Sequence, residues 1–566
     1  MASTPAPAAV PPTPLTRRAA IALAVLFALV WFCNLDYRRL IHPDEGRYAE
    51  IPREMMASGD WVTPRLNGIK YFEKPALQYW ITAAAYEVFG VREWSARLWP
   101  VLAGFLGVLV IGYVGFRLGG PTLGLYSAAA LGGSLGYVLS AHILTLDSGL
   151  TLWMAIGLGG LSLAQRDDAT PAEQRAWMWV AWAALALATL SKGLIGIVLP
   201  GGALVLYSLI ERDWSLWRRL HLASGAIVFL AVAAPWFVVV SLHNPEFFEF
   251  FFIHEHFTRF HTTEHRREGA WWYFVPILVV GILPWLTVLG WTARRMWTDA
   301  RPSRNGFNWQ RFALVWSAFI FVFFSASGSK LPSYILPVFP AVALAIGWQL
   351  TLLQASALLR LVAPLVVTTG VLTLVVFFGY GAIVQRIADE HQPLAPLLAY
   401  APWIRIAFAV ALTGGIAGWW WLARGMRTRA VLALALASLV WTQLIVSGYD
   451  ELAESRSSEP ILARAAARSP LSREVPFYTV KMYDQTLPYY LGRTVIQVAH
   501  PDELAMGIAL EPEKAIATVD EWKKRWDGAA QAYAMMQPDE YEKLRRESVA
   551  MVELARDPRR VIVSRR

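Results

Sequence analysis

Cysteine and charged residues are both scarce in this sequence. The 566 residues include one cysteine, Cys33, so an intrachain disulfide and a thiolate metal cluster are both excluded. Charged residues make up 16% of the chain, hydrophobic residues make up 56%, and the mean hydropathy is +0.40. Because a soluble protein carries about a quarter charged residues, most of this chain is predicted to lie in lipid.

Acidic residues are too few to balance the basic ones, and the formal net charge is +9. Nucleic-acid-binding proteins share such an excess. Here, however, Lys and Arg lie mostly in short loops between apolar runs, which is the pattern that sets topology beside anionic lipid. Nucleic acid is therefore excluded as a partner, and membrane lipids are expected instead.

Thirteen apolar runs follow one another along the chain, most of them near the length that crosses a bilayer. The first, Ile21 to Cys33, is followed by charged residues and not by the small residues of a signal cleavage site, so it is predicted to be an uncleaved span behind a cytoplasmic tail, residues 1–19. The other runs lie at roughly 95–116, 121–141, 148–164, 176–190, 194–210, 221–241, 272–292, 311–325, 334–353, 361–384, 402–423 and 429–447.

The short segment Pro75 to Gly90 decides which loops share a side of the membrane. If it does not cross, the Arg-rich loops lie on the side of Arg17 and Arg18, as the bias of basic residues toward the cytoplasm requires. The segment is therefore predicted to be an interfacial helix. The first loop (35–93), the loops around Asp147 and 243–271, and the C-terminal residues 449–566 then share the periplasmic face.

These runs predict an α-helical polytopic membrane protein with about thirteen transmembrane helices and periplasmic juxtamembrane helices. Residues 20–448 form its transmembrane catalytic domain, and residues 449–566 form a small periplasmic α/β domain. The pattern within that domain predicts helices at Glu459–Arg468 and Val519–Arg546 and strands at Val475–Met482, Thr494–Val498 and Arg560–Ser564.

Two acidic positions on the outer face are candidates for catalysis. Asp44 and Glu45 open a helix predicted to run through Met56, in a loop too highly charged for a passive connector. The alternative is that they only stabilise the helix dipole. Asp147 lies at the border of two spans, where an acid faces a cavity or caps the following helix.

Basic and aromatic residues on the same face are candidates for binding a phosphate. Lys74 follows Tyr71 and Glu73 where the chain re-enters the interface, and Arg47 and Tyr48 precede them in the same loop. A lysine in this position either snorkels to lipid headgroups or holds a phosphate. Tyr334 lies between prolines at a later span boundary, where a tyrosine can also be an anchor.

Histidines gather in the outer loop FFIHEHFTRFHTTEHRREGAWWYF, which contains His254, Glu255, His256 and Arg259. A His-x-His pair beside carboxylates can hold zinc. No compact zinc signature is complete, so a polar loop facing a phosphate is preferred.

Several segments resemble a known family. YAEIPREMMASGDW, YFEKPALQYW followed by FG, and TLSKG are similar to the C-type glycosyltransferases of the protein O-mannosyltransferase kind over about residues 20–340. DEGRYAEIPREMMASGDWVTPRL, EHFTRF with HRREGAWWYFVP, KLPSYILP and the tail segment MYDQTLPYYLGRTVIQVAHPDELAMGI resemble the bacterial lipid A aminoarabinose transferases more closely. Tyr489 replaces an expected phenylalanine, and His254 lies outside the family pattern at Glu255 and His256.

The resemblance implies transfer of 4-amino-4-deoxy-L-arabinose from undecaprenyl phosphate to a lipid A phosphate, with inversion, at the periplasmic face of a bacterial inner membrane. Such modification gives resistance to cationic antimicrobial peptides such as polymyxin. Because a lipid A phosphate is already anionic, a strong base is not required, and Asp44 is interpreted as an electrostatic and orienting group. Asp147 matches a second acid of the family, on the next outer loop, and is expected to be catalytic as well.

The remaining site residues have two expected roles. Lys74, Arg259, Arg47 and Tyr334 are expected to hold the carrier phosphate, and Tyr48, Tyr71, Glu73, Glu255 and His256 to line the substrate cavity. No metal is expected to be required, and zinc held by Glu73 and His254 would be adventitious. The protein is expected to be a monomer. The alternatives are a protein O-mannosyltransferase or another polyprenyl-phosphate-sugar transferase and, from a different class, a lipid-linked sugar transporter.

Overall fold

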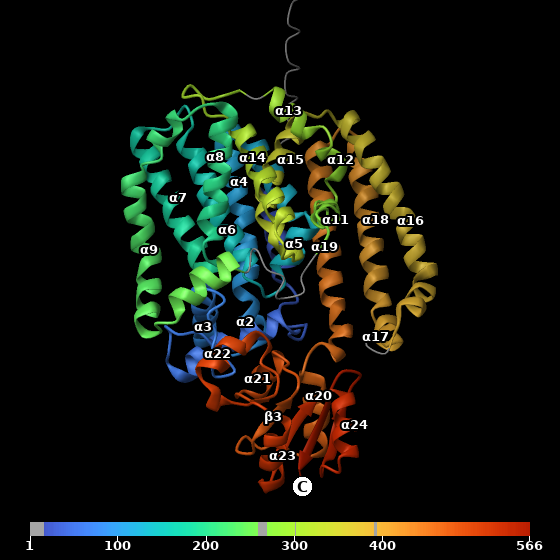
Figure 1. Ribbon diagram of the computed structural model, residues 1–566. Coiled ribbons are helices and arrows are strands. Elements are labelled where there is room, and N and C mark those ends of the chain that lie inside the picture. Colours follow the sequence, from blue (N-terminus) through green and yellow to red (C-terminus); the bar gives the residue numbers. More distant parts are fainter. Residues whose placement is uncertain (1–15, 259–268, 300, 390–392, 566) are drawn as a thin grey trace, which may run out of the picture.

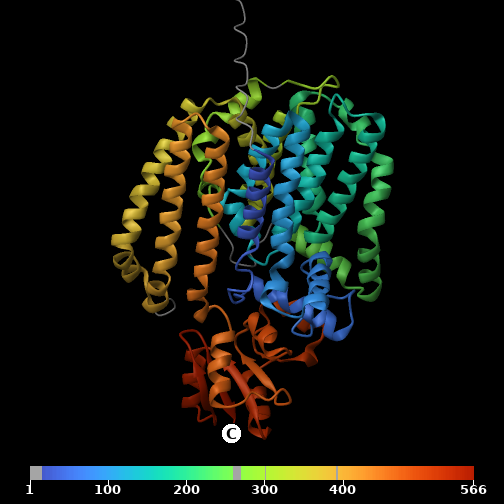
Figure 2. The same ribbon diagram turned by 180° about the vertical axis from the view of Figure 1, so that it is seen from behind.

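The computed structural model describes residues 16–258, 269–299, 301–389 and 393–565, with the side chains of 254–258 excepted. A bundle of long helices forms one part of the molecule, and a smaller domain with a β-sheet lies beyond one end of the bundle (Figure 1). The view from behind shows the same two parts, with α13 at the end of the bundle opposite the sheet domain (Figure 2). The chain is therefore a helical membrane protein with a C-terminal α/β domain, as predicted.

All thirteen predicted apolar runs lie on helices or on broken helices. Within the described part of the chain, seven helices are long and apolar enough to cross a membrane, or eight if the bent pair Phe274–Gly281 and Leu286–Thr298 is one span. Because other runs lie on shorter or more polar helices, the count of thirteen crossings stays a prediction. The helices are α1 (Arg17–Phe32), α4 (Glu93–Gly132), α5 (Leu135–Ala141), α6 (Asp147–Ala164), α7 (Pro171–Lys192), α8 (Ile195–Glu211), α9 (Leu222–His243), α11 (Phe274–Gly281), α12 (Leu286–Leu289), α13 (Thr292–Thr298), α14 (Trp309–Ala326), α15 (Phe339–Leu352), α16 (Ala355–Ile387), α17 (Leu394–Ala399), α18 (Ala401–Ala423) and α19 (Arg427–Gly448).

The 40 residues of helix α4 carry the predicted run 95–116 and the first part of the run 121–141, which ends in α5. Helix α4 breaks at Gly119 and Gly120, and Gly120 has a φ of 85°, which favours glycine. After the break the chain runs back beside the first arm of α4. The contact between the arms is close, since a Cβ added at Gly112 would lie 3.1 Å from the Cβ of Ala128. Small residues on both arms allow this close packing. The two runs therefore lie on separate, antiparallel arms, and that each of them crosses the membrane stays a prediction.

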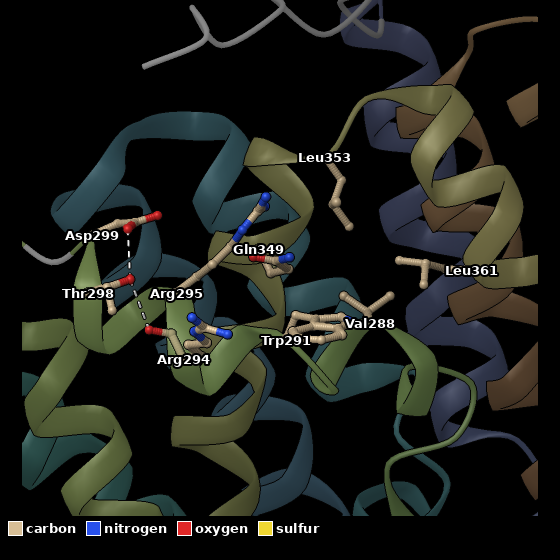
Figure 3. A pocket seen from close by; sticks show the side chains of 9 residues that line it. All are labelled: Val288, Trp291, Arg294, Arg295, Thr298, Asp299, Gln349, Leu353 and Leu361. Atoms are coloured by element: carbon tan, nitrogen blue, oxygen red, sulfur yellow. Dashed lines mark hydrogen bonds between the residues drawn. The ribbon is translucent and has the colours of Figure 1, made fainter. Parts of the chain in front are cut away.

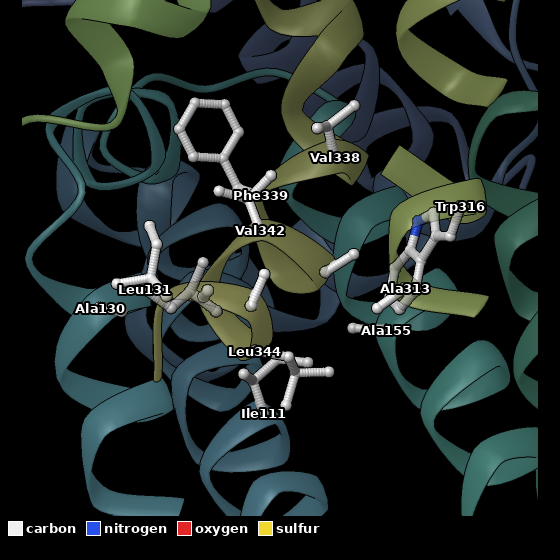
Figure 4. Close-up of a cluster of buried hydrophobic side chains, with 14 of the residues drawn as sticks. Ile111, Ala130, Leu131, Ala155, Ala313, Trp316, Val338, Phe339, Val342 and Leu344 are labelled. Atoms are coloured by element: carbon white, nitrogen blue, oxygen red, sulfur yellow. The ribbon is translucent and has the colours of Figure 1, made fainter. Parts of the chain in front are cut away.

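Helix α15 lies at the centre of the bundle, and α16 lies at its edge. The most apolar window of the segment containing α15 is 83% buried, whereas the window of α16 is 11% buried. Phe339, Val342 and Leu344 of α15 pack among side chains of α4, α6 and α14, including Ile111 and Trp316 (Figure 4). Since lipid replaces protein contacts around α16, its apolar residues are left exposed to the bilayer.

The first loop forms two helices at the end of the bundle that faces the sheet domain (Figure 1). Helix α2 spans Asp44–Ser58 and α3 spans Leu77–Phe89. The 13 residues of α3 extend only about 20 Å, less than the roughly 30 Å of a hydrocarbon core. This length agrees with the prediction that the segment does not cross.

The C-terminal domain contains a six-stranded sheet in the order β5-β4-β3-β6-β8-β7. Strands β5 to β6 are parallel in that order, and β8 runs antiparallel to both β6 and β7. The predicted helix Glu459–Arg468 is confirmed as α20. The elements are α20 (Glu459–Arg468), β3 (Phe477–Val480), α21 (Thr486–Leu491), β4 (Ile496–Val498), α22 (Ala505–Leu510), β5 (Ala515–Ile516), α23 (Val519–Gly528), β6 (Ala532–Met536), α24 (Pro538–Arg546), β7 (Val552–Arg556) and β8 (Val561–Arg565).

The prediction of one helix over Val519–Arg546 is wrong. Strand β6 interrupts it, and all five residues of β6 are buried. β6 pairs with β3 on one side and with β8 on the other, so it lies in the interior of the sheet. These partners satisfy its backbone groups and override the helical preference of the local sequence AYAMM.

The first loop is joined to the C-terminal domain by polar contacts. Arg39 Nη1 lies 2.7 Å from Asp450 Oδ2, and Arg65 Nη1 lies 3.0 Å from Glu511 Oε1. Asn67 donates to the Val495 carbonyl at 2.7 Å and accepts from the Val495 N–H at 2.7 Å. The two segments therefore lie on the same side of the helical region, as the sequence predicted.

Candidate active site

The adjacent acids at the start of α2 have different environments. Glu45 is buried, and both of its carboxylate oxygens accept hydrogen bonds from Arg38, at 2.6 and 2.7 Å. Arg97 donates to the same carboxylate twice, at 3.0 Å each. Burial alone would raise the pKa of Glu45, but the two guanidinium groups outweigh it and lower the pKa below its usual range. Glu45 is thus a structural anchor, while the carboxylate of Asp44 remains 35% exposed.

Arg47 is surrounded by aromatic rings and carboxylates. Its Nη1 lies 3.4 Å from Asp44 Oδ1, and its Nη2 forms an ion pair with Glu503 of the C-terminal domain. The guanidinium carbon lies 5.8 Å from the ring centre of Tyr48 and 5.9 Å from that of Tyr71. The residues predicted from α2 and from the loop after it therefore come together, and the C-terminal domain contributes an acid to them.

The carboxylates in this cluster outnumber its guanidinium. Burial raises the pKa of Glu503, Arg47 opposes that shift, and the nearby charge of Glu73 adds to it. Burial also raises the pKa of Tyr48, to which the charge of Asp44 adds. Asp44, Glu73 and Glu503 thus act electrostatically on one small volume around Arg47. Such a volume favours a ligand with a positive group.

Lys74 lies beside Glu73 at the edge of this cluster. Its ammonium donates to the Glu73 carbonyl at 2.7 Å and lies 3.9 Å from Glu73 Oε2. The Lys74 side chain is 17% exposed. A partly exposed ammonium next to the buried cluster is suitably placed to receive an anionic group.

A second cluster joins three elements around Asp147. Asp147 begins α6, and its carboxylate forms an ion pair with Lys192 at the end of α7. The Lys192 ammonium also lies 4.6 Å from the ring centre of Tyr334 in the 3₁₀ helix η3 (Pro332–Val338). Asp147 and Lys192 are only 6% and 10% exposed. The predicted residues Asp147 and Tyr334 are therefore linked through Lys192.

Glu45 connects the two clusters. Its Oε1 accepts a hydrogen bond from the N–H of Leu144 at 3.1 Å, in the segment that leads into α6. Arg38, its partner, donates to the carbonyl of His142 at 3.3 Å. The start of α2 and the start of α6 are therefore tied to one another, so Asp44 and Asp147 belong to neighbouring segments.

An apolar cleft of about 360 Å³ lies beside η3. Pro332 and Leu336, on either side of Tyr334, line it together with Leu139 of α5 and Ile277 of α11. Because this cleft is almost wholly apolar and adjoins the second cluster, it suits a hydrocarbon chain.

Several predicted residues cannot be placed. Arg259 lies outside the described residues, as do the side chains of His254, Glu255 and His256 at the end of the π-helix η2 (Glu249–Thr258). Among the residues that are described, no group of three or more His, Cys, Asp or Glu side chains is arranged to hold a metal ion. The option of zinc at Glu73 and His254 therefore stays untested.

Two site residues were missed in the sequence. Lys192 belongs to the segment TLSKG, and a lysine at the end of an otherwise apolar helix is a signal that was available. Glu503 offers no such local signal, because it reaches Arg47 only through the docking of the C-terminal domain.

Comparison with known proteins defines the class. Residues 17–298 match the family described as dolichyl-phosphate-mannose-protein mannosyltransferase, and residues 462–565 match the aminoarabinose transferase C-terminal domain. A helical membrane region with clustered cations and carboxylates, followed by this domain, defines a glycosyltransferase that uses a polyprenyl-phosphate sugar donor.

Individual relatives specify the family. The chain is 34% identical over 334 residues to the undecaprenyl phosphate-alpha-4-amino-4-deoxy-L-arabinose arabinosyl transferase 2 of Pseudomonas fluorescens, covering 59% of this chain and 56% of that one. It is 31% identical to the corresponding transferase of Pectobacterium atrosepticum, over 78% of this chain and 79% of that one. The crystal structure of ArnT from Cupriavidus metallidurans bound to undecaprenyl phosphate matches with a TM-score of 0.91 and 38% identity, over 98% and 99% of the two chains.

The chain belongs to the undecaprenyl phosphate-aminoarabinose arabinosyl transferases. The resemblance noted in the sequence is confirmed, and the alternatives of a protein O-mannosyltransferase and of a transporter are not favoured.

Proposed function

We propose that this protein transfers 4-amino-4-deoxy-L-arabinose from undecaprenyl phosphate to a phosphate group of lipid A. The observation that carries the proposal is the excess of carboxylates around Arg47, where Asp44, Glu73 and Glu503 act on one volume. A neutral sugar offers such a site only hydroxyl hydrogen bonds, whereas the ammonium group of an aminosugar is also attracted by its charge. The names of the relatives support this sugar and this carrier.

Two lysines, Lys74 and Lys192, are assigned to the carrier phosphate. Lys74 lies beside the sugar volume at the membrane border, with its ammonium partly exposed, and we assign it to the carrier phosphate together with Arg259. Lys192 and Tyr334 lie next to the apolar cleft, which suits a polyprenyl chain. The bond from the sugar to the carrier phosphate breaks, the electron pair stays on that phosphate, and a lipid A phosphate oxygen forms the new bond with inversion. Cations near the leaving phosphate stabilise its developing charge.

Asp44 acts on the sugar without taking a proton from the acceptor. A lipid A phosphate is ionised at neutral pH, so no strong base is required. The exposed part of the Asp44 carboxylate stabilises the sugar ammonium and the positive charge that develops at the anomeric carbon. Since cations already neutralise the carrier phosphate, the reaction as proposed requires no metal ion. We also infer that the protein works as a monomer.

We place the site on the periplasmic face of a bacterial inner membrane. The arginine-rich loops at the α13 end support this orientation, because basic residues favour the cytoplasm. With Cys33 replaced by serine, we expect a membrane-impermeant thiol reagent to label Ser58→Cys in intact spheroplasts and not Arg301→Cys. If only Arg301→Cys were labelled, the orientation would be the opposite of the one proposed.

The function is tested with purified protein, the undecaprenyl-phosphate-linked aminosugar and lipid A, with the product followed by mass spectrometry. Wild-type protein is expected to add the aminosugar to lipid A. Asp44→Asn keeps the size and shape of the side chain and removes no cap, because the N-cap of α2 is Pro43. It should nevertheless lower turnover about 100-fold or more through lost electrostatic stabilisation. Asp36→Asn, at an exposed position in the same loop, is the matched control.

Two outcomes would contradict the proposal. If lipid A gains no sugar while a peptide hydroxyl is glycosylated from the same carrier, the acceptor is wrong. If Asp44→Asn and Asp36→Asn turn over at the same rate as wild type, Asp44 is only a residue of the helix start and Asp147 becomes the leading catalytic acid.

A further inference from the structure

A separate cavity lies at the end of the helical region that faces away from the C-terminal domain. It measures about 380 Å³ and lies between α12, α13, α15 and α16 (Figures 1 and 3). Nine residues line it: Val288, Trp291, Arg294, Arg295, Thr298, Asp299, Gln349, Leu353 and Leu361. None of these residues belongs to either cluster of the candidate active site.

Basic side chains outnumber acidic ones in the lining of this cavity. Within the described part of the chain, no carboxylate forms an ion pair with Arg294 or Arg295, and both residues are exposed. Asp299, the one acid in the lining, accepts a hydrogen bond from Thr298 Oγ1 at 2.8 Å, and Figure 3 shows this bond at the rim, with Gln349 deeper between Arg295 and Trp291. Two guanidinium groups that share one cavity favour an anionic ligand with several oxygens.

Gln349 adds a second, independent signal at the base of the cavity. Its side chain is 3% exposed, and its amide oxygen has no hydrogen-bond partner. A buried acceptor without a donor is costly, so a ligand that supplies a hydroxyl group is favoured. The same cavity has an apolar side formed by Val288, Leu353 and Leu361, which suits the start of an acyl chain.

We propose that this cavity binds the head group of an anionic phospholipid with head-group hydroxyls, the chemistry of phosphatidylglycerol. The phosphate lies against Arg294 and Arg295, a glycerol hydroxyl donates to Gln349, and one acyl chain follows Leu361 of α16 into the bilayer. Trp291 is an exposed aromatic residue at this end of the bundle, and such residues are common at membrane interfaces. Basic pockets between helices at this position suit such head groups. The site does not depend on the proposed reaction, since it lies at the opposite end of the bundle.

Native mass spectrometry of the full-length protein in detergent tests the proposal, with phosphatidylglycerol and phosphatidylcholine as probes. Removal of the charge-assisted bonds in Arg294→Gln/Arg295→Gln should weaken the first phosphatidylglycerol binding step by about tenfold or more. Arg301→Gln/Arg304→Gln is the matched control, because it removes the same charge from exposed positions at the same end, outside the cavity. This control is expected to bind like wild type.

A second variant keeps the charges. Leu361→Trp fills part of the cavity and should weaken phosphatidylglycerol binding while both arginines remain, and thermal unfolding confirms that each variant is folded. Equal binding by the cavity variants and the control would overturn the proposal, as would equal affinity for phosphatidylcholine. Displacement of the lipid by millimolar inorganic phosphate would also overturn it, because that result identifies a site for free anions.

Discussion

Asp44 and Glu45 are adjacent in the sequence but have different roles, since Glu45 fixes the start of α2 and Asp44 faces the candidate site. Glu45 accepts bonds from two arginines and from the N–H of Leu144, so its position is fixed by three segments of the chain. That fixation determines where α2 begins and which way its first turn faces. Asp44 is consequently presented to the cluster around Arg47 with a partly exposed carboxylate. Glu45 holds the start of α2 in place, and the carboxylate of Asp44 therefore stays available to a substrate.

The ion pair of Asp147 and Lys192 should behave as a unit. Because both groups are buried, removing one partner leaves an uncompensated charge, and Asp147→Asn or Lys192→Met alone should cost about 3–5 kcal/mol in unfolding free energy. The double variant should cost less than the sum of the single variants, and activity should be lost in all three. Denaturant unfolding and single-turnover transfer measure the two effects.

The exposed pair of Asp520 and Lys523 in the C-terminal domain is the matched control for this cycle. Its single and double variants should add without coupling, because solvent screens the charges. Simple additivity at Asp147 and Lys192 would show that the pair is not a unit and would remove Lys192 from the site.

At the scale of elements, helix α2 is the part that joins the membrane region to the C-terminal domain. Gly46 allows this contact, because a Cβ at that position would lie 2.5 Å from the carbonyl carbon of Gln485 and 2.6 Å from the N–H nitrogen of Thr486. These are backbone atoms at the start of α21, so they cannot rotate away. The close approach also brings Glu503 within reach of Arg47.

Gly46→Ala should therefore separate α2 from α21. Overpacking of this kind costs about 1–3 kcal/mol, and the loss of the ion pair between Arg47 and Glu503 should lower turnover as well. Thermal unfolding and transfer assays measure the two effects. Gly381→Ala in α16 is the control, since an added Cβ there meets nothing within 4 Å. A Gly46→Ala protein with wild-type stability and activity would contradict this account of the contact.

The sequence predicts the elements whose structure is determined by the local pattern of apolar and charged residues. Apolar runs and the bias of basic residues give the helical region and the shared side of the first loop and tail, since lipid imposes both patterns directly. Strand β6 was missed because its residues are moderate helix formers whose state depends on β3 and β8. Glu503 was missed for a similar reason, because its contact with Arg47 exists only after the domain docks.

At the scale of the whole molecule, the two parts meet at a junction rich in titratable groups. Arg560 pairs with Asp484 at 2.8 Å and with Asp557 at 2.6 Å, all within the C-terminal domain. His42 of the first loop lies against this group, where its ring Nε2 accepts a bond from Arg559 and its backbone N–H donates to the Arg456 carbonyl at 2.9 Å. The position of the C-terminal domain therefore depends on a histidine that is neutral.

Acidification should loosen this junction through His42. Burial lowers the pKa of His42 from its ordinary value of 6.5 to about 4. Below pH 6.5 the undocked histidine takes up a proton that the docked one does not, so docking weakens progressively as the pH falls from about 6.5 to 4, by roughly 3 kcal/mol in all. Hydrogen exchange of the α21 amides, corrected for intrinsic rates, measures the opening at several pH values in this window.

His42→Gln should flatten the pH dependence of this opening because an amide stays neutral. His500→Gln, at a more exposed position in the C-terminal domain, should retain the wild-type slope. An unchanged slope in His42→Gln would assign the acid sensitivity to other groups at the junction. One of these is Asp484, where burial raises the pKa of the carboxyl but Arg560 and the other groups around it outweigh burial and lower that pKa.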